Sequence, residues 1–317
     1  MRKILVIGNY KLDKTQVDNL RNCDTCGDLV EFVFEATGRV DLVCVLNTVR
    51  MPMVVRAPMN KFVKLVQEPN VKASIFHKFV TSHPRVFSKV WGHHGSFSMG
   101  TRSLRFEETA PLLFPQVHAS KGSQPKTQLL SIISSTLSSL PGHKSRNEFI
   151  EKVQRFHPEL KRHTFGRGRV EVSKKDNALD AYMYSLAIEN SQIPSFITEK
   201  LLDCILREAV PVYFGAVNVH AFFPEDSVVQ IKSLDELAAK NLLLGLSRDD
   251  YNRRLPALLE AKRKYLNEMR ICCMLTCELQ AEEPGRDKRA LLLPPLGEVL
   301  KWAAALRFRW ANIRNRQ

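Results

Sequence analysis

The sequence lacks any apolar run of the length that a membrane span requires. A transmembrane helix needs about 20 consecutive apolar residues, and the segment MRKILVIGNY at the start holds only the short apolar core 4–7 before Gly8 and Asn9. That core is too short for the apolar region of a signal peptide. We therefore predict that this segment forms the first β-strand of a globular protein.

The cysteines lack the even, regular spacing of a disulfide-rich secreted domain. There are seven of them, an odd number, at positions 23, 26, 44, 204, 272, 273 and 277. This usage favours a reducing compartment, the cytoplasm. Cys23 and Cys26 form a lone C-x-x-C, and the next cysteines that could join them, from Cys272 onward, lie far along the chain without zinc-finger spacing. We therefore predict no metal site.

Acidic residues are fewer than basic ones. Lysine and arginine number 47 against 33 aspartates and glutamates, which gives a net charge of +14. Such a charge favours phosphates, nucleic acid or an anionic membrane. The basic residues are dispersed and lack an interleaved aromatic platform outside the tail, so nucleic acid is not the expected partner. The tail 301–317 mixes tryptophans with arginines, which suits either an interfacial amphipathic helix at the inner membrane face or a helix packed on the protein body.

Length and patterning predict two α/β domains. A chain of 317 residues with 44% hydrophobic content can bury two cores. We expect an N-terminal acceptor-binding domain over 1–120, a linker near 119–128, a second domain over 121–275 and a basic helical tail over 276–317. The expected strands are 3–8, 40–46, 62–67, 129–133, 163–166, 184–189 and 210–214, and the expected helices are 145–156, 199–209 and 235–243.

The segment 182–215 is the most informative part of the chain. An apolar strand delivers Glu189 and Asn190 to a loop, and the loop leads into a helix that opens on Thr198, Glu199 and Lys200. A strand end followed by a helix start is where open α/β sheets bind ligands, because helix N-terminal amides favour anionic groups. Lys200 adds a positive charge. The segment therefore predicts a site for a nucleotide diphosphate.

The same segment resembles the donor-binding motif of the α-1,3-fucosyltransferases of glycosyltransferase family 10. That motif is roughly F-x-x-x-x-E-N-S followed by Y-x-T-E-K, and here residues 185–191 read SLAIENS and residues 196–200 read FITEK. The resemblance covers about 125–265 and is weak over 1–120. It implies a GT-B-like α/β fold, with two Rossmann-type domains facing across a cleft and a C-terminal helical tail.

The resemblance also implies a reaction. L-fucose would pass from GDP-fucose, with inversion, to a hydroxyl of an oligosaccharide or lipid-linked glycan. The chain has no Asp-x-Asp element of the kind that metal-dependent GT-A enzymes use. We therefore expect no required metal or cofactor beyond the GDP-fucose donor.

Within the motif, Lys200 is the expected contact of the diphosphate, and Thr198 precedes it at the helix start. By resemblance Glu199 accepts hydrogen bonds from ribose or sugar hydroxyls, although a carboxylate there also suits helix capping. Glu189 and Asn190 either contact the sugar or brace the loop. Phe196 stands where the family usually has a tyrosine, so one hydroxyl contact to the donor is missing, while the ring still permits stacking on the donor.

A second cationic group is expected from the G-H-K-x-R element at 142–146. Arg146 would contact the phosphates through its planar fork, on a helix that Ser145 could cap. Lys144 is a weaker candidate. Arg167 lies in F-G-R-G, which suits either a tight turn beside the donor pocket or a purely structural turn.

The general base is expected from the first domain. Residues 67–69 read Gln-Glu-Pro after an apolar strand and resemble the Q-E-P element of the family, in which the glutamate is the base, so Glu68 is the candidate. A surface carboxylate at a strand end is the alternative. His93 or His94 would line the acceptor side of the site.

Two other classes of function stay open at this point. The same fold could use a different nucleotide-sugar donor, which the Phe196 difference permits. Alternatively, the chain could be a non-catalytic basic protein that binds nucleic acid or glycan.

Overall fold

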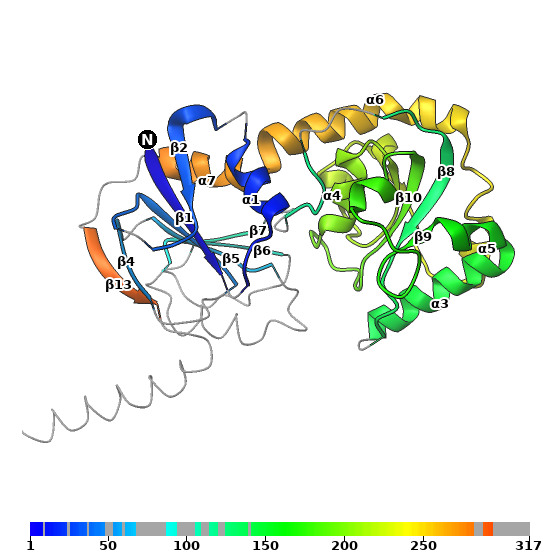
Figure 1. Ribbon diagram of the computed structural model, residues 1–317, viewed down its shortest axis with the longest axis horizontal. Coiled ribbons are helices and arrows are strands. Elements are labelled where there is room, and N and C mark those ends of the chain that lie inside the picture. The colour runs from blue at the N-terminus through cyan, green and yellow to red at the C-terminus, as the bar shows by residue number, and fades with distance from the viewer. Residues whose placement is uncertain are drawn as a thin grey trace, which may run out of the picture. The chain divides into compact units, whose positions relative to one another are not determined.

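The structure is a computed structural model in two compact units (Figure 1). It describes residues 1–8, 10–23, 26–36, 38–47, 53–58, 61–67, 87–93, 105–108, 114–119, 124–138, 141–281 and 288–293. The first unit comprises Met1–Leu12, Cys26–Thr109 and Met274–Gln317, and the second comprises Asp13–Thr25 and Ala110–Cys273. Each unit is built on its own parallel sheet.

The first unit holds a six-stranded parallel sheet in the order β2-β1-β3-β5-β6-β7. Its central strands β3 and β5 are buried along their whole length, as expected of a parallel sheet covered on both faces. The predicted strands near 3–8, 40–46 and 62–67 are confirmed. The strands are β1 (Arg2–Gly8), β2 (Val30–Val33), β3 (Leu42–Leu46), β5 (Phe62–Leu65), β6 (Lys89–Gly92) and β7 (Arg105–Glu108).

The predicted C-terminal tail is helical only in part. Helix α7 (Ile271–Gln280) ends near the start of the predicted tail. Residues Lys288–Leu293 of the tail form strand β13, which pairs antiparallel with β4 (Met53–Pro58). Val55 and Ala57 alternate on one face of β4 and are both buried. This alternation is typical of a strand with a pairing partner, and it favours a strand over a helix for Lys288–Leu293. Residues 294–317, which carry the tryptophans of the predicted interfacial helix, lie outside the described residues.

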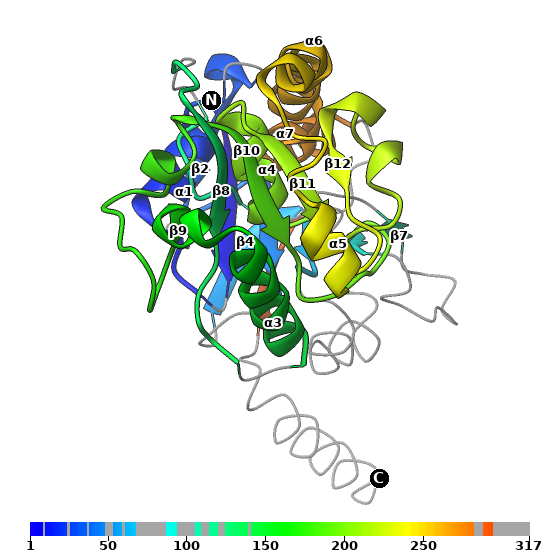
Figure 2. The ribbon, with the colours of Figure 1, turned by 90° about the vertical axis from the view of Figure 1, so that its right-hand side faces the viewer.

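The second unit holds a five-stranded parallel sheet in the order β12-β11-β10-β8-β9 (Figure 2). In chain order this is a 2-1-3-4-5 arrangement, so the connections change direction between β8 and β10. The predicted strands are confirmed at β8 (Gln128–Ile133), β9 (Thr164–Phe165), β10 (Tyr182–Ile188) and β11 (Val210–Phe214), and the short β12 (Val229–Gln230) completes the sheet. Two parallel α/β sheets in one chain confirm the predicted pair of Rossmann-type domains.

The helices of the second unit begin at well-defined caps. Thr198 caps α4 (Glu199–Leu206), Asp235 caps α5 (Glu236–Asn241) and Ser247 caps α6 (Arg248–Lys264). In each case the side-chain oxygen accepts a hydrogen bond from a backbone N–H. Helix α6 continues through a π-helical turn, Tyr265–Met269, toward α7. The remaining helix near the N-terminus, α1 (Lys14–Arg21), opens on a capping box at Asp13.

The prediction that Ser145 caps the helix carrying Arg146 is wrong. Helix α3 (Pro141–Phe156) begins four residues earlier, so Ser145 lies inside its first turns. Proline is well suited to the first helical position, because its φ is already helical and its missing N–H would have no partner there. None of the helices in the described part of the chain has both the length and the apolar character that crossing a bilayer requires.

Candidate active site

The topology of the second sheet marks one edge as a ligand site. Ligands of open parallel sheets bind beyond the carboxyl ends of the strands where the connections change direction, which here is between β8 and β10. Chain segments leaving these two strands bring Ser135 and Glu189 to this edge, and the helices that follow, α3 and α4, start from it. The motif residues of 189–200 therefore lie where the fold favours binding.

Glu189 is the centre of the hydrogen-bonded network at this edge. Its side chain is buried, and its Oε1 accepts from the Thr198 N–H at 3.1 Å and from the Thr198 hydroxyl at 2.6 Å. Its Oε2 lies 3.1 Å from the Lys200 ammonium. The carboxylate thus ties the end of β10 to the first turn of α4, so loop bracing, one of the two predicted roles of Glu189, is present in the structure.

Lys200 lies between two carboxylates. Its Nζ donates to Glu189 Oε2, to Glu199 Oε1 at 3.3 Å and to the Thr198 hydroxyl at 3.2 Å. Burial opposes the charge on Lys200, but the two carboxylates outweigh burial and raise its pKa. Lys200 is therefore a fixed positive charge at the helix start, as predicted.

Glu199 is ionised and positioned to accept hydrogen bonds. Burial alone would raise its pKa, but Lys200 and Lys175 together lower the pKa to about 2. Burial has the larger effect on Glu189, whose pKa it raises against the pull of Lys200. The two neighbouring carboxylates thus differ in their environments, and Glu199 has the lower pKa of the two.

Arg146 extends from α3 to the same edge. Its Nη1 donates to Asn190 Oδ1 at 3.0 Å and its Nη2 donates to the Ser135 carbonyl at 3.3 Å. Its buried Nε has no hydrogen-bond partner among the described residues. Burial lowers the pKa of Arg146, while Glu189 acts to raise it. The structure therefore brings together Arg146, Asn190 and Glu189, three of the predicted residues, with one guanidinium N–H left to donate.

Phe196 lies in the loop between β10 and α4, and its ring is buried. The Tyr213 hydroxyl donates to the Phe196 carbonyl at 3.3 Å and accepts from the Ala216 N–H at 3.0 Å. Ser195 has a left-handed φ of 63° and is braced by Asn218, whose Oδ1 accepts from the Ser195 N–H at 2.7 Å. Tyr213 and Asn218 were not predicted, because no local motif connects them to 189–200.

The weaker candidates Lys144 and Arg167 have exposed side chains. Lys144 lies 3.9 Å from Glu148 one turn further along α3. The backbone of Arg167 accepts from the Thr136 N–H at 3.1 Å, and Gly166, at φ 125°, packs so closely on Ser134 that a Cβ there would lie 2.6 Å from the Ser134 carbonyl. The F-G-R-G turn therefore supports the segment after β8 through its backbone.

A second buried ion pair lies behind the helix start. Lys175 Nζ is 2.6 Å from Asp203 Oδ2, with Asp203 fully buried on α4. Against the effect of burial, Asp203 and Glu199 raise the pKa of Lys175. A cavity of about 10 Å³ lies among Lys175, Lys200 and Asp203, which is close to the space of one water molecule. This pair was not predicted either, since Lys175 follows no recognisable motif.

In the first unit, a separate polar cluster lies at the carboxyl ends of the strands. Gln67 donates its N–H to Asn47 Oδ1 at 2.8 Å and accepts at Oε1 from the Tyr10 hydroxyl at 2.8 Å. His93, which is fully buried, lies with Nε2 3.1 Å from the Gln67 carbonyl. Glu68, the predicted base, and His94 lie outside the described residues.

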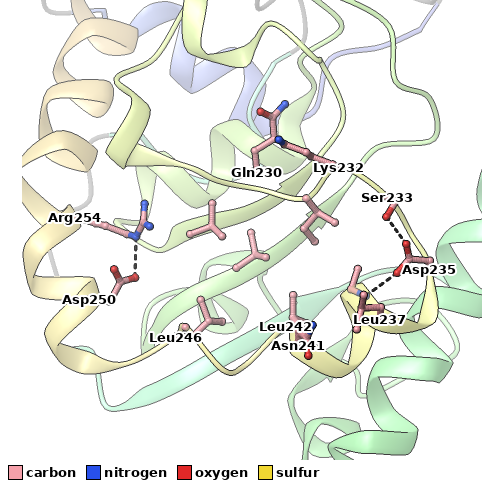
Figure 3. A pocket seen from close by; sticks show the side chains of 15 residues that line it. Gln230, Lys232, Ser233, Asp235, Leu237, Asn241, Leu242, Leu246, Asp250 and Arg254 are labelled. Atoms are coloured by element: carbon pink, nitrogen blue, oxygen red, sulfur yellow. Dashed lines mark hydrogen bonds and ion pairs between the residues drawn. The ribbon is translucent and has the colours of Figure 1, made fainter.

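A pocket of about 440 Å³ opens at the β12 edge of the second sheet (Figure 3). Its apolar lining includes Val212, Ile231, Leu242 and Leu246. The Arg254 guanidinium at its side is paired with Asp250 at 2.8 Å. None of the predicted site residues lines this pocket, so it is separate from the network around Glu189.

Comparison with known proteins identifies the second unit. The family model described as "Glycosyltransferase family 10 (fucosyltransferase) C-term" matches residues 123–280. An alpha-(1,4)-fucosyltransferase of Arabidopsis thaliana is 44% identical over 71 residues, which are 22% of this chain and 18% of that protein. The alpha-(1,3)-fucosyltransferase FucT of Helicobacter pylori is 29% identical over 109 residues, 32% of this chain and 22% of that protein.

The matched segments thus span less than a quarter of either relative. A crystal structure of an alpha1,3-fucosyltransferase with GDP-fucose superposes with a TM-score of 0.47 at 17% identity, covering 90% of this chain and 92% of that one. The family match, by contrast, takes in about half of the chain and the whole network around Glu189. Through residues 123–280, the chain belongs to glycosyltransferase family 10.

Proposed function

We propose that the chain is an inverting glycosyltransferase that transfers L-fucose from GDP-fucose to an acceptor hydroxyl. The observation that carries this proposal is that Lys200, paired with Glu189, and Arg146, hydrogen-bonded to the adjacent Asn190, both lie at the switch point of the second sheet. Two fixed cations at a helix-start edge suit a diphosphate. Membership of a family of fucosyltransferases supports L-fucose and GDP as the parts of the donor.

The chemistry assigns a task to each group. The acceptor oxygen forms a bond to the anomeric carbon as the bond from that carbon to the diphosphate oxygen breaks, and the electron pair leaves on GDP. Lys200 and Arg146, whose Nε has no hydrogen-bond partner in the part of the chain that the structure describes, stabilise the charge that develops on the leaving diphosphate. This stabilisation is greatest in the transition state, so it accelerates the reaction.

The carboxylates have different tasks. Glu199, held as an anion with a pKa of about 2, accepts hydrogen bonds from ribose or sugar hydroxyls. Glu189 keeps Thr198 and Lys200 in place. Glu68 takes the proton from the acceptor hydroxyl, a role that rests on the Q-E-P element alone.

Binding measurements with a matched pair of variants test the donor site. Arg146→Ala should weaken GDP binding by about 1.5 to 3 kcal/mol, the usual contribution of hydrogen bonds to a charged group. Lys144→Ala, two residues away on the same helix but with an exposed side chain, should bind GDP like the wild type. Calorimetric titration with GDP, GDP-fucose, GDP-mannose and UDP gives both the affinity and the base preference. Equal losses in the two variants would refute the assigned site.

A second donor remains a candidate because of Phe196. The family usually has a tyrosine at this position, and its hydroxyl is missing here. Transfer assays with GDP-mannose beside GDP-fucose decide between the two sugars. Faster turnover with GDP-mannose would replace L-fucose in the proposal and leave the nucleotide site unchanged.

The acceptor is proposed as an oligosaccharide or a lipid-linked glycan. The net charge of +14 and the basic tail favour a substrate at an anionic membrane face, with the protein in the cytoplasm. Activity should persist in EDTA, since cationic side chains take the place of a metal at the diphosphate. Loss of turnover in EDTA, restored by Mg²⁺ or Mn²⁺, would contradict the metal-independent mechanism.

A further inference from the structure

Three cysteines from distant parts of the sequence meet in the second unit. Cys23 follows the end of α1, and Cys272 and Cys273 lie in the first turn of α7. The Cys23 sulfur lies 2.6 Å from that of Cys272 and 3.5 Å from that of Cys273, and the sulfurs of Cys272 and Cys273 are 3.9 Å apart. We call these three residues the thiol cluster.

The separations within the thiol cluster suit a shared metal ion. Four sulfurs around a tetrahedral zinc, each about 2.3 Å from the ion, are about 3.8 Å from one another. Two of the three separations are close to that value, and the three side chains are at most 5% exposed. Burial keeps water away and leaves the sulfurs available as soft ligands.

The backbone around the thiol cluster is held in place independently of the sulfurs. The Arg270 guanidinium donates to the carbonyls of Asn19 and of Asn22, the residue immediately before Cys23. This fixes the end of α1 against the start of α7.

The sequence offers a fourth ligand. Cys26 completes a C-x-x-C with Cys23, the spacing of paired ligands in structural zinc sites. Cys26 is buried as well. The sequence alone did not predict this set of ligands, because about 250 residues separate Cys23 from Cys272.

We propose that Cys23, Cys272 and Cys273, with Cys26 as the fourth ligand, bind one structural Zn²⁺ ion. The ion would hold the end of α1 against the start of α7. It would thereby connect the first and the last segment of the chain in the second unit. It would have no part in sugar transfer, because the thiol cluster shares no residue with the network around Glu189. The zinc site can therefore be tested independently of the proposed transferase function.

Metal analysis of the purified full-length chain, prepared under reducing conditions, tests this proposal. We expect about one zinc per chain by inductively coupled plasma mass spectrometry. Replacement by Co²⁺ should produce the near-ultraviolet bands of cobalt–thiolate charge transfer. Removal of zinc by a strong chelator should lower Tm, and added Zn²⁺ should restore it.

Cysteine variants identify the ligands. Cys23→Ser and Cys272→Ser should each lose the bound zinc, whereas Cys277→Ser, exposed on the same helix α7, should retain it. If the ligand variants fail to fold, the cobalt spectrum of the wild type still reports whether thiolates bind the ion.

Two results would overturn the proposal. One is a chain with no bound metal whose cluster thiols all react with a thiol reagent after denaturation. The other is a Cys23–Cys272 disulfide, which would show as a linked peptide pair and as a loss of two hydrogens in the intact mass.

Discussion

The fully buried Glu189 carboxylate and the partly buried Lys200 ammonium form an ion pair, 3.1 Å apart, between the end of β10 and the first turn of α4. This pair joins two of the elements that define the ligand edge of the second sheet. Thr198 adds two hydrogen bonds to the same carboxylate. The geometry of the candidate site therefore depends on Glu189 even if this residue never contacts a substrate.

Glu189→Gln should destabilise the protein markedly. Glutamine has the same shape, but it leaves Lys200 with one carboxylate instead of two. Breaking a buried ion pair costs about 3 kcal/mol or more, measurable as a loss in the free energy of unfolding in urea. Glu148→Gln, which removes an exposed partner of Lys144, should cost less than about 0.5 kcal/mol. Similar losses of unfolding free energy in the two variants would show that the Glu189–Lys200 pair contributes no more to stability than an exposed ion pair.

Gly142→Ala should disturb the site through the backbone. A Cβ at Gly142 would lie 1.9 Å from the carbonyl oxygen of Asn190, so α3 and the loop after β10 would have to separate. We expect a cost of about 1 to 3 kcal/mol, typical of overpacking, and weaker GDP binding because Asn190 is the partner of Arg146.

The control for this variant is Gly245→Ala. No atom lies within 4 Å of a Cβ built at Gly245, so that variant should keep both the stability and the GDP affinity of the wild type. Normal stability of Gly142→Ala in the same urea titration would mean that the close approach of α3 to Asn190 is not required.

Lys64 should make stability rise with pH above neutrality. Its side chain is fully buried on β5, and burial lowers its pKa from 10.5 to about 7. Between these two values the unfolded chain holds a proton that the folded chain has lost, so the free energy of unfolding increases as pH rises. Urea titrations between pH 7 and 9.5 should show this slope.

Lys64→Met should reduce that slope without abolishing it. Lys126, whose pKa burial lowers to about 8, contributes a slope of the same sign. Lys3→Met, at a half-exposed position on β1, should leave the slope unchanged. An unaltered slope in Lys64→Met would mean that Lys64 keeps its proton in the folded protein.

Much of the fold could be predicted from apolar runs. Strands such as β3 and β10 are buried on both faces, and their continuous apolar sequences distinguish them from helices. Strand β13 could not be predicted in this way, because its pairing with β4 connects segments that are more than 200 residues apart. Helix α6 was missed because its surface is highly charged and Pro256 interrupts the pattern.

The candidate site could likewise be predicted only where its residues lie in local sequence motifs. The residues of 189–200 and Arg146 follow from local motifs, and the structure brings them together. Lys175 lowers the pKa of Glu199 and is paired with Asp203, but Lys175 and Asp203 belong to different segments and only the folded chain shows their contact. Cys23 and Cys272 meet for the same reason, since only tertiary structure joins the two ends of the second unit.

The assignment of the general base to the first domain gives a further prediction. Glu68→Ala should bind GDP-fucose as tightly as the wild type and lose turnover by at least about 100-fold, the usual contribution of a general base. Single-turnover kinetics and calorimetry on the same preparation separate these two quantities. Loss of donor binding in Glu68→Ala would contradict the base assignment.

Asn47 tests the same assignment from a neighbouring position. Its Oδ1 accepts from the Gln67 N–H at 2.8 Å, directly before Glu68, and its own φ of 56° is one that glycine adopts freely. Asn47→Gly therefore keeps the backbone shape and removes only the contact that holds Gln67. We expect a smaller fall in turnover than in Glu68→Ala, again with unchanged donor affinity, because a displaced base still works when it reaches the acceptor. A wild-type rate in Asn47→Gly would show that the Q-E-P segment needs no support from β3.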